Sequence, residues 1–257
     1  MTSASAPSSS PRNVHLDSDR ISRTIEQLSK RIDERFPGSG LSQVCTELYT
    51  ISLAAEVDLA AVSKPNWFLR AAVAVFVAIL VLGLILSITR LGLEVGNITW
   101  IDLIQGFESA TNEIILIGAA LLFLVSIEGR VKRNRVIHDI NRLRSIAHVI
   151  DIHQLTKDPT VIIAGASKTA SSPVREMSVF ELGRYLDYCS EMLSLTGKVG
   201  FLYSQSFPDP QTVTAVNDLE ELTTGLSRKI WQKIMLLEDI AANLEHARET
   251  PMIFLED

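Results

Sequence analysis

The feature that most constrains the fold is an uncharged run of nineteen residues between Arg70 and Arg90, AAVAVFVAILVLGLILSIT. A helix rises about 1.5 Å per residue, so this run covers about 28 Å, close to the thickness of the hydrocarbon core of a bilayer. A core helix of a soluble domain seldom stays apolar on every face over this length. The run therefore predicts a first transmembrane helix over 71–89.

A second apolar run, IILIGAALLFLVSI, lies between Glu113 and Glu128 and has fourteen residues, or about 21 Å of helix. By length alone it could be a re-entrant or buried segment. Two features favour a span: residues 109–112 are small or neutral and can extend the helix, and thinning of the bilayer costs little per ångström of mismatch. We expect a second transmembrane helix over 111–127 and a short extracytoplasmic loop over 90–110.

That loop has the pattern of a short helix of its own. Its apolar residues recur at helical spacing, but its polar residues are acidic, so it lacks the usual electrostatic attraction to anionic lipid. The apolar residues are Trp100, Leu103, Ile104 and Phe107.

Basic residues next to the two runs predict the orientation. They flank the runs on the outer sides of the pair, whereas the loop between the runs is acidic, and Lys and Arg gather on the cytoplasmic side of a membrane. Both termini are therefore expected in the cytoplasm of a multi-pass plasma-membrane protein, which is the inner membrane in a bacterium. The basic residues are Lys64, Arg70, Arg130, Lys132, Arg133 and Arg135.

The composition agrees with a membrane location and excludes other classes. A mean hydropathy of +0.22 with 47% hydrophobic residues is too apolar for an ordinary soluble chain. Two cysteines exclude a disulfide-dense secreted scaffold, and a net charge of −6 argues against a nucleic-acid binder. The partners expected from composition are therefore a lipid bilayer and proteins.

The segment before the first run predicts a cytoplasmic helical hairpin over 14–63, after a Ser-, Ala- and Pro-rich disordered tail over 1–13. The first helix ends at Pro37, and the second runs from about Leu41 to Val62. The apolar faces consist of Ile21, Ile25, Leu28 and Ile32 in the first helix and Leu41, Val44, Leu48, Ile51 and Ala55 in the second.

The second span is expected to continue into the cytoplasm over 128–155, because no helix breaker occurs before Pro159. A connector loop over 156–177 follows, in which VIIAG is a candidate strand and SKTASSP favours disorder. A second cytoplasmic hairpin over 178–247 precedes an acidic tail over 248–257. The apolar stripes are Val136, Ile140, Leu143, Ala147 and Ile150; Val179, Leu182, Leu186, Cys189, Leu193 and Thr196; and Val216, Leu219, Thr223, Leu226, Ile230, Ile234, Leu237, Ala241 and Leu244.

Near-heptad stripes of this kind specify antiparallel bundle or coiled-coil packing. The sequence therefore predicts an all-α membrane protein, in which a two-span transmembrane helical hairpin carries a cytoplasmic α-helical bundle built from N- and C-terminal amphipathic helices. This plan resembles, in architecture alone, the two-span effector domains found beside bacterial nucleotide-signalling systems. The resemblance implies a pore built from several copies.

The segment AGASKTAS looks like a phosphate-binding loop, but it lacks the spacing that such a loop requires. A single Gly165 precedes Lys168 by three residues, and position 167 is not glycine, so the backbone amides that wrap a phosphate are not provided at the required spacing. Nucleotide hydrolysis is therefore not expected.

The candidate metal ligands are His148, Asp151 and His153. His148 and Asp151 are three residues apart and share a helix face, which suits a divalent metal or a proton-sensing pair. His148 and His153 point about 140° apart on one helix, and neither H-E-x-x-H nor C-x-x-C occurs in the chain. We interpret these residues as polar-face side chains and keep the metal site as the alternative.

Three further features each allow a structural or a functional interpretation. Cys189 lies at a core-facing position, where a thiol behaves as a small hydrophobe. Arg184, Asp187 and Glu191 are expected to form an exposed ion-pair face or a partner surface. We interpret Trp231, which has basic neighbours, as a packing residue.

The two runs contain no ionisable residue, whereas transporters and pumps usually place functional charges in their spans. We expect a non-enzymatic two-pass membrane protein without a cofactor, whose cytoplasmic bundle forms a homo-oligomer and binds a cytoplasmic protein partner as an anchor, scaffold or signalling component. One alternative is an oligomeric ligand-gated pore. Another is a membrane-bound metal-dependent enzyme that uses His148, Asp151 and His153.

Overall fold

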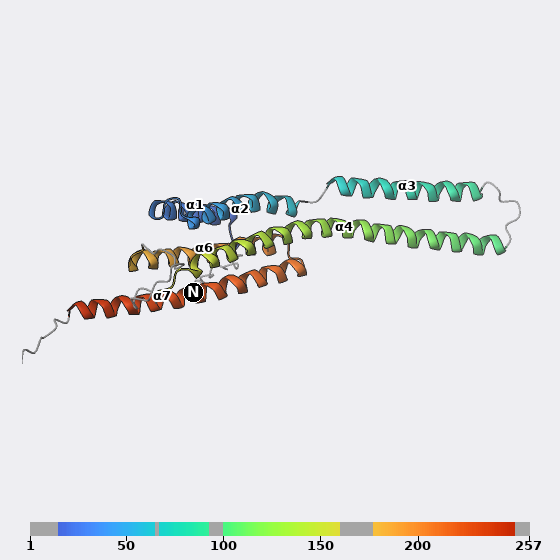
Figure 1. Cartoon of the computed structure of the whole chain (residues 1–257). Coiled ribbons are helices and arrows are strands. Elements are labelled where there is room, and N and C mark those ends of the chain that lie inside the picture. The colour runs from blue at the N-terminus through green and yellow to red at the C-terminus, as the bar shows by residue number, and fades with distance from the viewer. Residues whose placement is uncertain (1–14, 65–66, 93–99, 160–176, 250–257) are drawn as a thin grey trace, which may run out of the picture. The chain divides into compact units, whose positions relative to one another are not determined.

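The computed structural model describes residues 15–64, 67–92, 100–159 and 177–249. Within these ranges the chain is entirely helical and has no strand, which confirms the predicted all-helical class for this part of the protein. The expected tail 1–13, all but the first two residues of the expected tail 248–257, and most of the connector with its candidate strand VIIAG lie outside the described residues. The helices are α1 (Ser18–Arg35), α2 (Gly40–Ser63), α3 (Trp67–Gly92), α4 (Trp100–Leu155), α6 (Val179–Ser206) and α7 (Pro210–Glu249) (Figure 1).

The chain divides into two compact units. The bundle unit comprises Met1–Leu59 and Ile140–Asp257, and the apolar unit comprises Ala60–Asp139. The boundaries fall inside α2 and α4, so each of these helices contributes turns to both units.

The first two helices of the bundle unit form around a short turn. Asp17 caps α1 by accepting a hydrogen bond from the backbone N–H of Asp19, at 3.1 Å. After α1 the chain turns through Gly38, whose φ of 64° is a left-handed conformation that glycine adopts without strain. The Ser42 hydroxyl then donates to the Asp33 carboxylate at 2.8 Å, which joins α2 to α1.

The last two helices form an antiparallel hairpin. A Cβ built on Gly197 would lie 3.2 Å from Oγ1 of Thr223, and one built on Gly183 would lie 3.5 Å from Cδ2 of Leu237. Because the position on α7 falls as the position on α6 rises, residues whose numbers sum to about 420 lie at the same level of the hairpin. The sum therefore tells which residues of α6 and α7 lie at the same height along the hairpin axis.

The core of the bundle unit consists largely of the apolar stripes predicted from the sequence. Val179 and Ala241 of those stripes are half-buried, and the side chain of Leu244 lies outside the described residues. The buried members are Ile21, Ile25, Leu28, Ile32, Leu41, Val44, Leu48, Ile51, Ala55, Ile140, Leu143, Ala147, Ile150, Leu182, Leu186, Cys189, Leu193, Thr196, Val216, Leu219, Thr223, Leu226, Ile230, Ile234 and Leu237, and Val136 is buried in the apolar unit.

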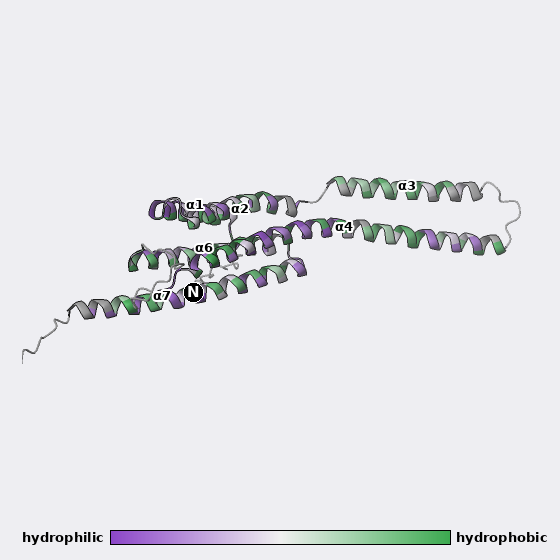
Figure 2. Cartoon of the chain, in the orientation of Figure 1, coloured by the Kyte–Doolittle hydropathy of each residue, from purple (hydrophilic) through white to green (hydrophobic). Residues whose placement is uncertain are grey.

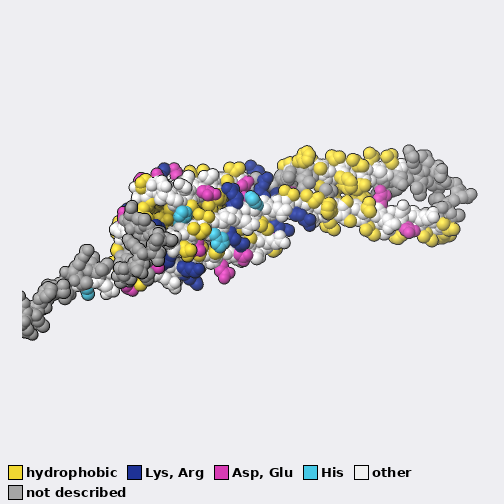
Figure 3. All heavy atoms as spheres, viewed as in Figure 1, with side chains coloured by type: hydrophobic (Ala, Val, Ile, Leu, Met, Phe, Trp, Pro, Cys, Tyr) yellow, Lys and Arg dark blue, Asp and Glu magenta, His cyan; other side chains and the backbone are white. Residues whose placement is uncertain are grey.

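The apolar unit has the opposite distribution, because most of its described large hydrophobic side chains are exposed or only partly buried. In Figure 2 α3 is coloured mainly white to green, and in Figure 3 hydrophobic side chains dominate the visible surface of this unit. By length and composition, one helix among the described residues could cross a membrane, the Ile104–Leu155 part of α4, and none of its most apolar stretch is buried. The described apolar stretch of α3, Ala71–Gly83, is shorter, so the two-span arrangement stays a prediction.

The helix expected within the outer loop is present, but it is not separate from the second apolar run. α4 begins at Trp100 and continues through residues 100–110 into that run without interruption. α3 likewise continues to Gly92. The physical reason is that no proline interrupts α4, and the small residues 109–112 continue a helix as readily as they end a loop.

Candidate functional site

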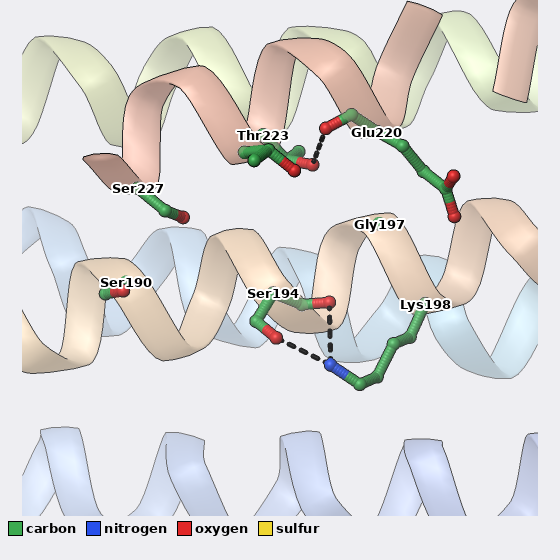
Figure 4. Close-up of a pocket in the computed structure, with 8 residues that line it drawn as sticks. Ser190, Ser194, Gly197, Lys198, Glu220, Thr223 and Ser227 are labelled. Carbon is green, nitrogen blue, oxygen red and sulfur yellow. Dashed lines mark hydrogen bonds between the residues drawn. The ribbon is translucent and has the colours of Figure 1, made fainter. Parts of the chain in front are cut away.

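The candidate site is a groove between α6 and α7 with a volume of about 440 Å³. Seven of the eight residues that line it have polar side chains, and five of these carry a hydroxyl group. The lining residues are Ser190, Ser194, Gly197 and Lys198 on α6, and Glu220, Thr223, Thr224 and Ser227 on α7 (Figure 4).

The groove exists because small side chains recur on one face of each helix. Ser190, Ser194 and Gly197 follow one another at intervals of four and three residues, so they share a face of α6. Thr224 and Ser227 lie on α7 with a similar spacing. Small residues at these positions leave empty the space that larger side chains would fill, and this space is the groove.

Two charged side chains stand at one end of the groove. The Lys198 ammonium donates to the Ser194 hydroxyl at 2.6 Å and lies 3.5 Å from the Ser194 carbonyl oxygen. Glu220 stands on the other helix, and its carbonyl oxygen accepts a hydrogen bond from the Thr223 hydroxyl at 3.2 Å. By the level relation of the hairpin, Lys198 and Glu220 are separated by only about 3 Å along the helix axes.

The chemistry of the groove is that of an open polar surface. It offers hydroxyls that donate and accept hydrogen bonds, one ammonium and one carboxylate, and Lys198 and Glu220 are both exposed. Its two charges cancel, so the groove has no net attraction for an anion or a cation. It suits a partner surface that itself presents small polar groups and both signs of charge.

The structure does not bring the candidate metal ligands together. His148 is exposed, Asp151 accepts a hydrogen bond from the Gln154 side-chain amide at 2.6 Å, and His153 packs against Gly40 of α2. Among the described residues, no three His, Cys, Asp or Glu side chains are grouped so that they could hold a metal ion. Burial and the nearby Lys157 lower the pKa of His153 from its usual 6.5.

Both cysteines are buried in the bundle unit, and for Cys189 this agrees with its predicted core position. Burial raises the pKa of the Cys45 thiol, and of the Cys189 thiol, to about 12. A thiol with such a pKa is protonated near neutral pH and is a poor nucleophile.

The predicted ion-pair face on α6 forms one ion pair within that helix and one with α1. Arg184 pairs with Asp187 at 3.0 Å, and Glu191 pairs with Arg31 of α1 at 2.6 Å. The guanidinium groups of Arg184 and Arg31 also lie over the Tyr188 ring, at 5.1 and 5.9 Å from its centroid. Arg31 and Arg184 both line a hollow of about 410 Å³ between α1 and α6, and because each has an acidic partner, we interpret this region as a packing contact between the two helices.

The interpretation of Trp231 as a packing residue is wrong, because its side chain is 60% exposed. Ile230 and Ile234 occupy the buried stripe of α7, and position 231 is rotated by about 100° from position 230. Trp231 therefore faces away from the core, one turn beyond Ser227 of the groove.

Sequence reasoning missed the groove, although a signal was present. Hydroxyl-bearing and glycine residues recur beside the apolar heptads at 190, 194 and 197 and again at 220–227. Such residues look like ordinary solvent-facing positions until the pairing of α6 with α7 places the two sets opposite each other. Comparison of the chain with known protein families, curated proteins and solved structures finds no match.

Proposed function

We propose that the chain is a non-enzymatic membrane protein that crosses the bilayer twice and self-associates through its cytoplasmic bundle. In this role it is an anchor, scaffold or signalling component that presents the bundle to a cytoplasmic protein partner. The observation that carries the proposal is the contrast between the units: the bundle unit buries its apolar stripes, whereas the apolar unit exposes its own. Exposed apolar helices of this length require lipid or protein around them.

The continuity of α4 supports its part in the membrane crossing. The helix between Glu108 and Glu128 covers about 30 Å, which matches a hydrocarbon core better than the fourteen-residue run alone. Glu113 is the one charged residue inside this stretch, near its outer end.

Aromatic side chains support crossing by both apolar helices. Trp67, at the start of α3, is 79% exposed, and Trp100, at the start of α4, is 82% exposed. Tryptophan is enriched where a span meets the membrane interface. With both termini in the cytoplasm, Trp67 would lie at the cytoplasmic interface and Trp100 at the outer one.

Membrane anchoring and self-association are tested on the full chain. We expect it to stay in the membrane fraction after alkaline carbonate washing, and the chain in nanodiscs to give a mass of two or more copies by light scattering. Release by carbonate would contradict anchoring. A strictly monomeric mass over the accessible concentration range would contradict self-association.

The single continuous helix α4 favours one further candidate, an oligomeric ligand-gated pore. Because α4 belongs to both units, a ligand that rearranges the bundle unit can act on the apolar turns of the same helix. Two spans cannot enclose a pore, so this function needs several copies. Ion flux from liposomes that depends on a ligand and on a closed oligomer would favour the pore over the anchor.

A further inference from the structure

We infer that the groove between α6 and α7 is the surface on which a second copy of this chain docks. The inference rests on the proposed self-association and specifies its surface and geometry. It follows from where the two charges stand, from the small side chains of the groove, and from the exposed tryptophan beside it.

The charges are complementary across the groove. Lys198 lines one side and Glu220 the other, at nearly the same level, yet within one chain Lys198 bonds to Ser194. A two-fold axis that runs along the hairpin, with two grooves face to face, places Lys198 of each copy against Glu220 of the other. Each dimer then contains two identical ion pairs, as an isologous interface requires.

The same charges discriminate between the two possible directions of pairing. Lys198 and Glu220 both lie at the end of the groove away from Ser190 and Ser227 (Figure 4). An antiparallel pairing would place both charges of one copy against the hydroxyl end of the other, with no charged partner. The groove therefore favours parallel hairpins, an orientation that two copies inserted the same way in one membrane can adopt.

The lining of the groove allows close approach. Ser194 and Thr224 carry small side chains and Gly197 carries none, so a facing helix can approach without displacing bulky groups. Serine and threonine hydroxyls can then hydrogen-bond across the interface, which avoids leaving buried polar groups unsatisfied.

Trp231 gives the interface its large apolar contact. It lies one turn beyond Ser227 on α7, and its side chain is mostly exposed in the single chain. Tryptophan and other aromatic residues are enriched in protein interfaces and among the residues that dominate binding energy. In the parallel dimer both copies of Trp231 lie at the same end, where each is covered by the facing copy.

Charge reversal tests the pairing on the full chain in nanodiscs, with the dimer dissociation constant measured by fluorescence exchange between labelled copies. Lys198→Glu replaces both ion pairs by facing carboxylates, and Glu220→Lys replaces both by facing ammonium groups. Each variant alone is expected to weaken the dimer by at least about tenfold. Both side chains are exposed, so the fold should be retained and can be checked by circular dichroism.

The decisive arm mixes the two variants. A heterodimer of the Lys198→Glu and Glu220→Lys chains contains two restored ion pairs, as does a homodimer of the double variant. Recovery of wild-type affinity in both supports the inference. Weakening by the single variants without recovery in the mixture would overturn it, because general damage to the surface would give that result.

Two controls separate this inference from the proposed function. Glu221→Lys and Arg228→Glu reverse exposed charges that do not line the groove, and they should leave the dissociation constant unchanged. Ser194→Trp fills the groove and should prevent docking while the chain remains folded. If the wild-type chain self-associates but none of the groove variants weakens it, the docking surface is wrong and self-association stands. A monomeric wild-type chain would overturn both.

Discussion

The Lys233 ammonium of α7 binds the C-terminal turn of α4 through Gln154, donating to its backbone carbonyl at 2.8 Å and to its side-chain oxygen at 2.7 Å. The Gln154 carbonyl also accepts a hydrogen bond from the Lys157 backbone N–H at 3.1 Å, and Lys233 adds a charged donor that complements the helix dipole. Gln154 is buried. This contact therefore fastens the end of α4 to the hairpin.

Replacing Lys233 by methionine should destabilise the bundle unit by about 1–3 kcal/mol, because a buried carbonyl and amide oxygen lose a charged donor. The measurement is urea unfolding of the full chain in detergent, followed by circular dichroism. Lys229→Met is the matched control, because Lys229 is exposed on the same helix, and it should change the unfolding free energy little. Equal losses in the two variants would contradict the role of the Gln154 contact.

Two glycines of the α6–α7 hairpin, Gly200 and Gly225, predict opposite effects of a glycine-to-alanine substitution on stability. Gly200 faces Leu219, and an added Cβ would be only 2.5 Å from Leu219 Cδ2, whereas nothing lies within 4 Å of a Cβ at Gly225. Gly200→Ala should destabilise the bundle by about 1–3 kcal/mol through overpacking. Gly225→Ala should stabilise it by up to about 1 kcal/mol, because alanine is the better helix former. Stabilisation by both substitutions would show that α6 and α7 do not approach each other this closely.

The half-buried His153 predicts a loss of stability in acid. Burial lowers its pKa in the folded chain, so between the folded pKa and the usual 6.5 the unfolded chain binds the proton more readily. Stability from this group is complete above the usual value and falls as the pH drops below it. His153→Gln should reduce the slope of the unfolding free energy between about pH 5 and 7. A slope that is unchanged in His153→Gln would assign the effect to other groups.

The exposure of Trp231 predicts tolerance to substitution in the single chain. Trp231→Gln should change the free energy of unfolding of the monomer by no more than about 0.5 kcal/mol. The adjacent Ile230→Ala should cost about 2–5 kcal/mol, because Ile230 is fully buried. The comparison is made in detergent at concentrations where the chain is monomeric. A large loss in Trp231→Gln would restore the packing interpretation.

Much of the bundle could be predicted from the sequence, because its helices bury one stripe each. Ile25 and Leu28 of α1 and Leu186 and Leu193 of α6 recur at helical spacing, and all four are fully buried. The end of α1 is also predictable, since Pro37 and the left-handed Gly38 follow its C-cap residue, Phe36. A periodic pattern of this kind records which face of a helix is covered.

The remaining features depend on relations between helices that a single pattern does not contain. The groove needs Ser194 and Thr224 to meet, and this depends on the register of two helices. The basic neighbours of Trp231 are too few to favour a charged partner, so the sequence favours a packing residue, although position 231 lies off the buried stripe of α7. The continuity of α4 is not evident from the sequence, because the small and neutral residues 109–112 fit either the end of a separate short helix or the middle of a long one.

The number of membrane crossings is tested most directly by labelling single cysteines from outside intact cells, in a chain whose buried Cys45 and Cys189 are replaced by serine or alanine. Gln27→Cys, Gln105→Cys and Ser145→Cys place exposed thiols before α3, before the most apolar part of α4 and after it. Two crossings predict that an impermeant maleimide labels only the thiol at position 105, and that those at 27 and 145 react after lysis. If the thiols at positions 27 and 105 behave alike, and the thiol at 145 reacts under the opposite condition, α4 alone crosses the membrane. That result would contradict the two-pass account.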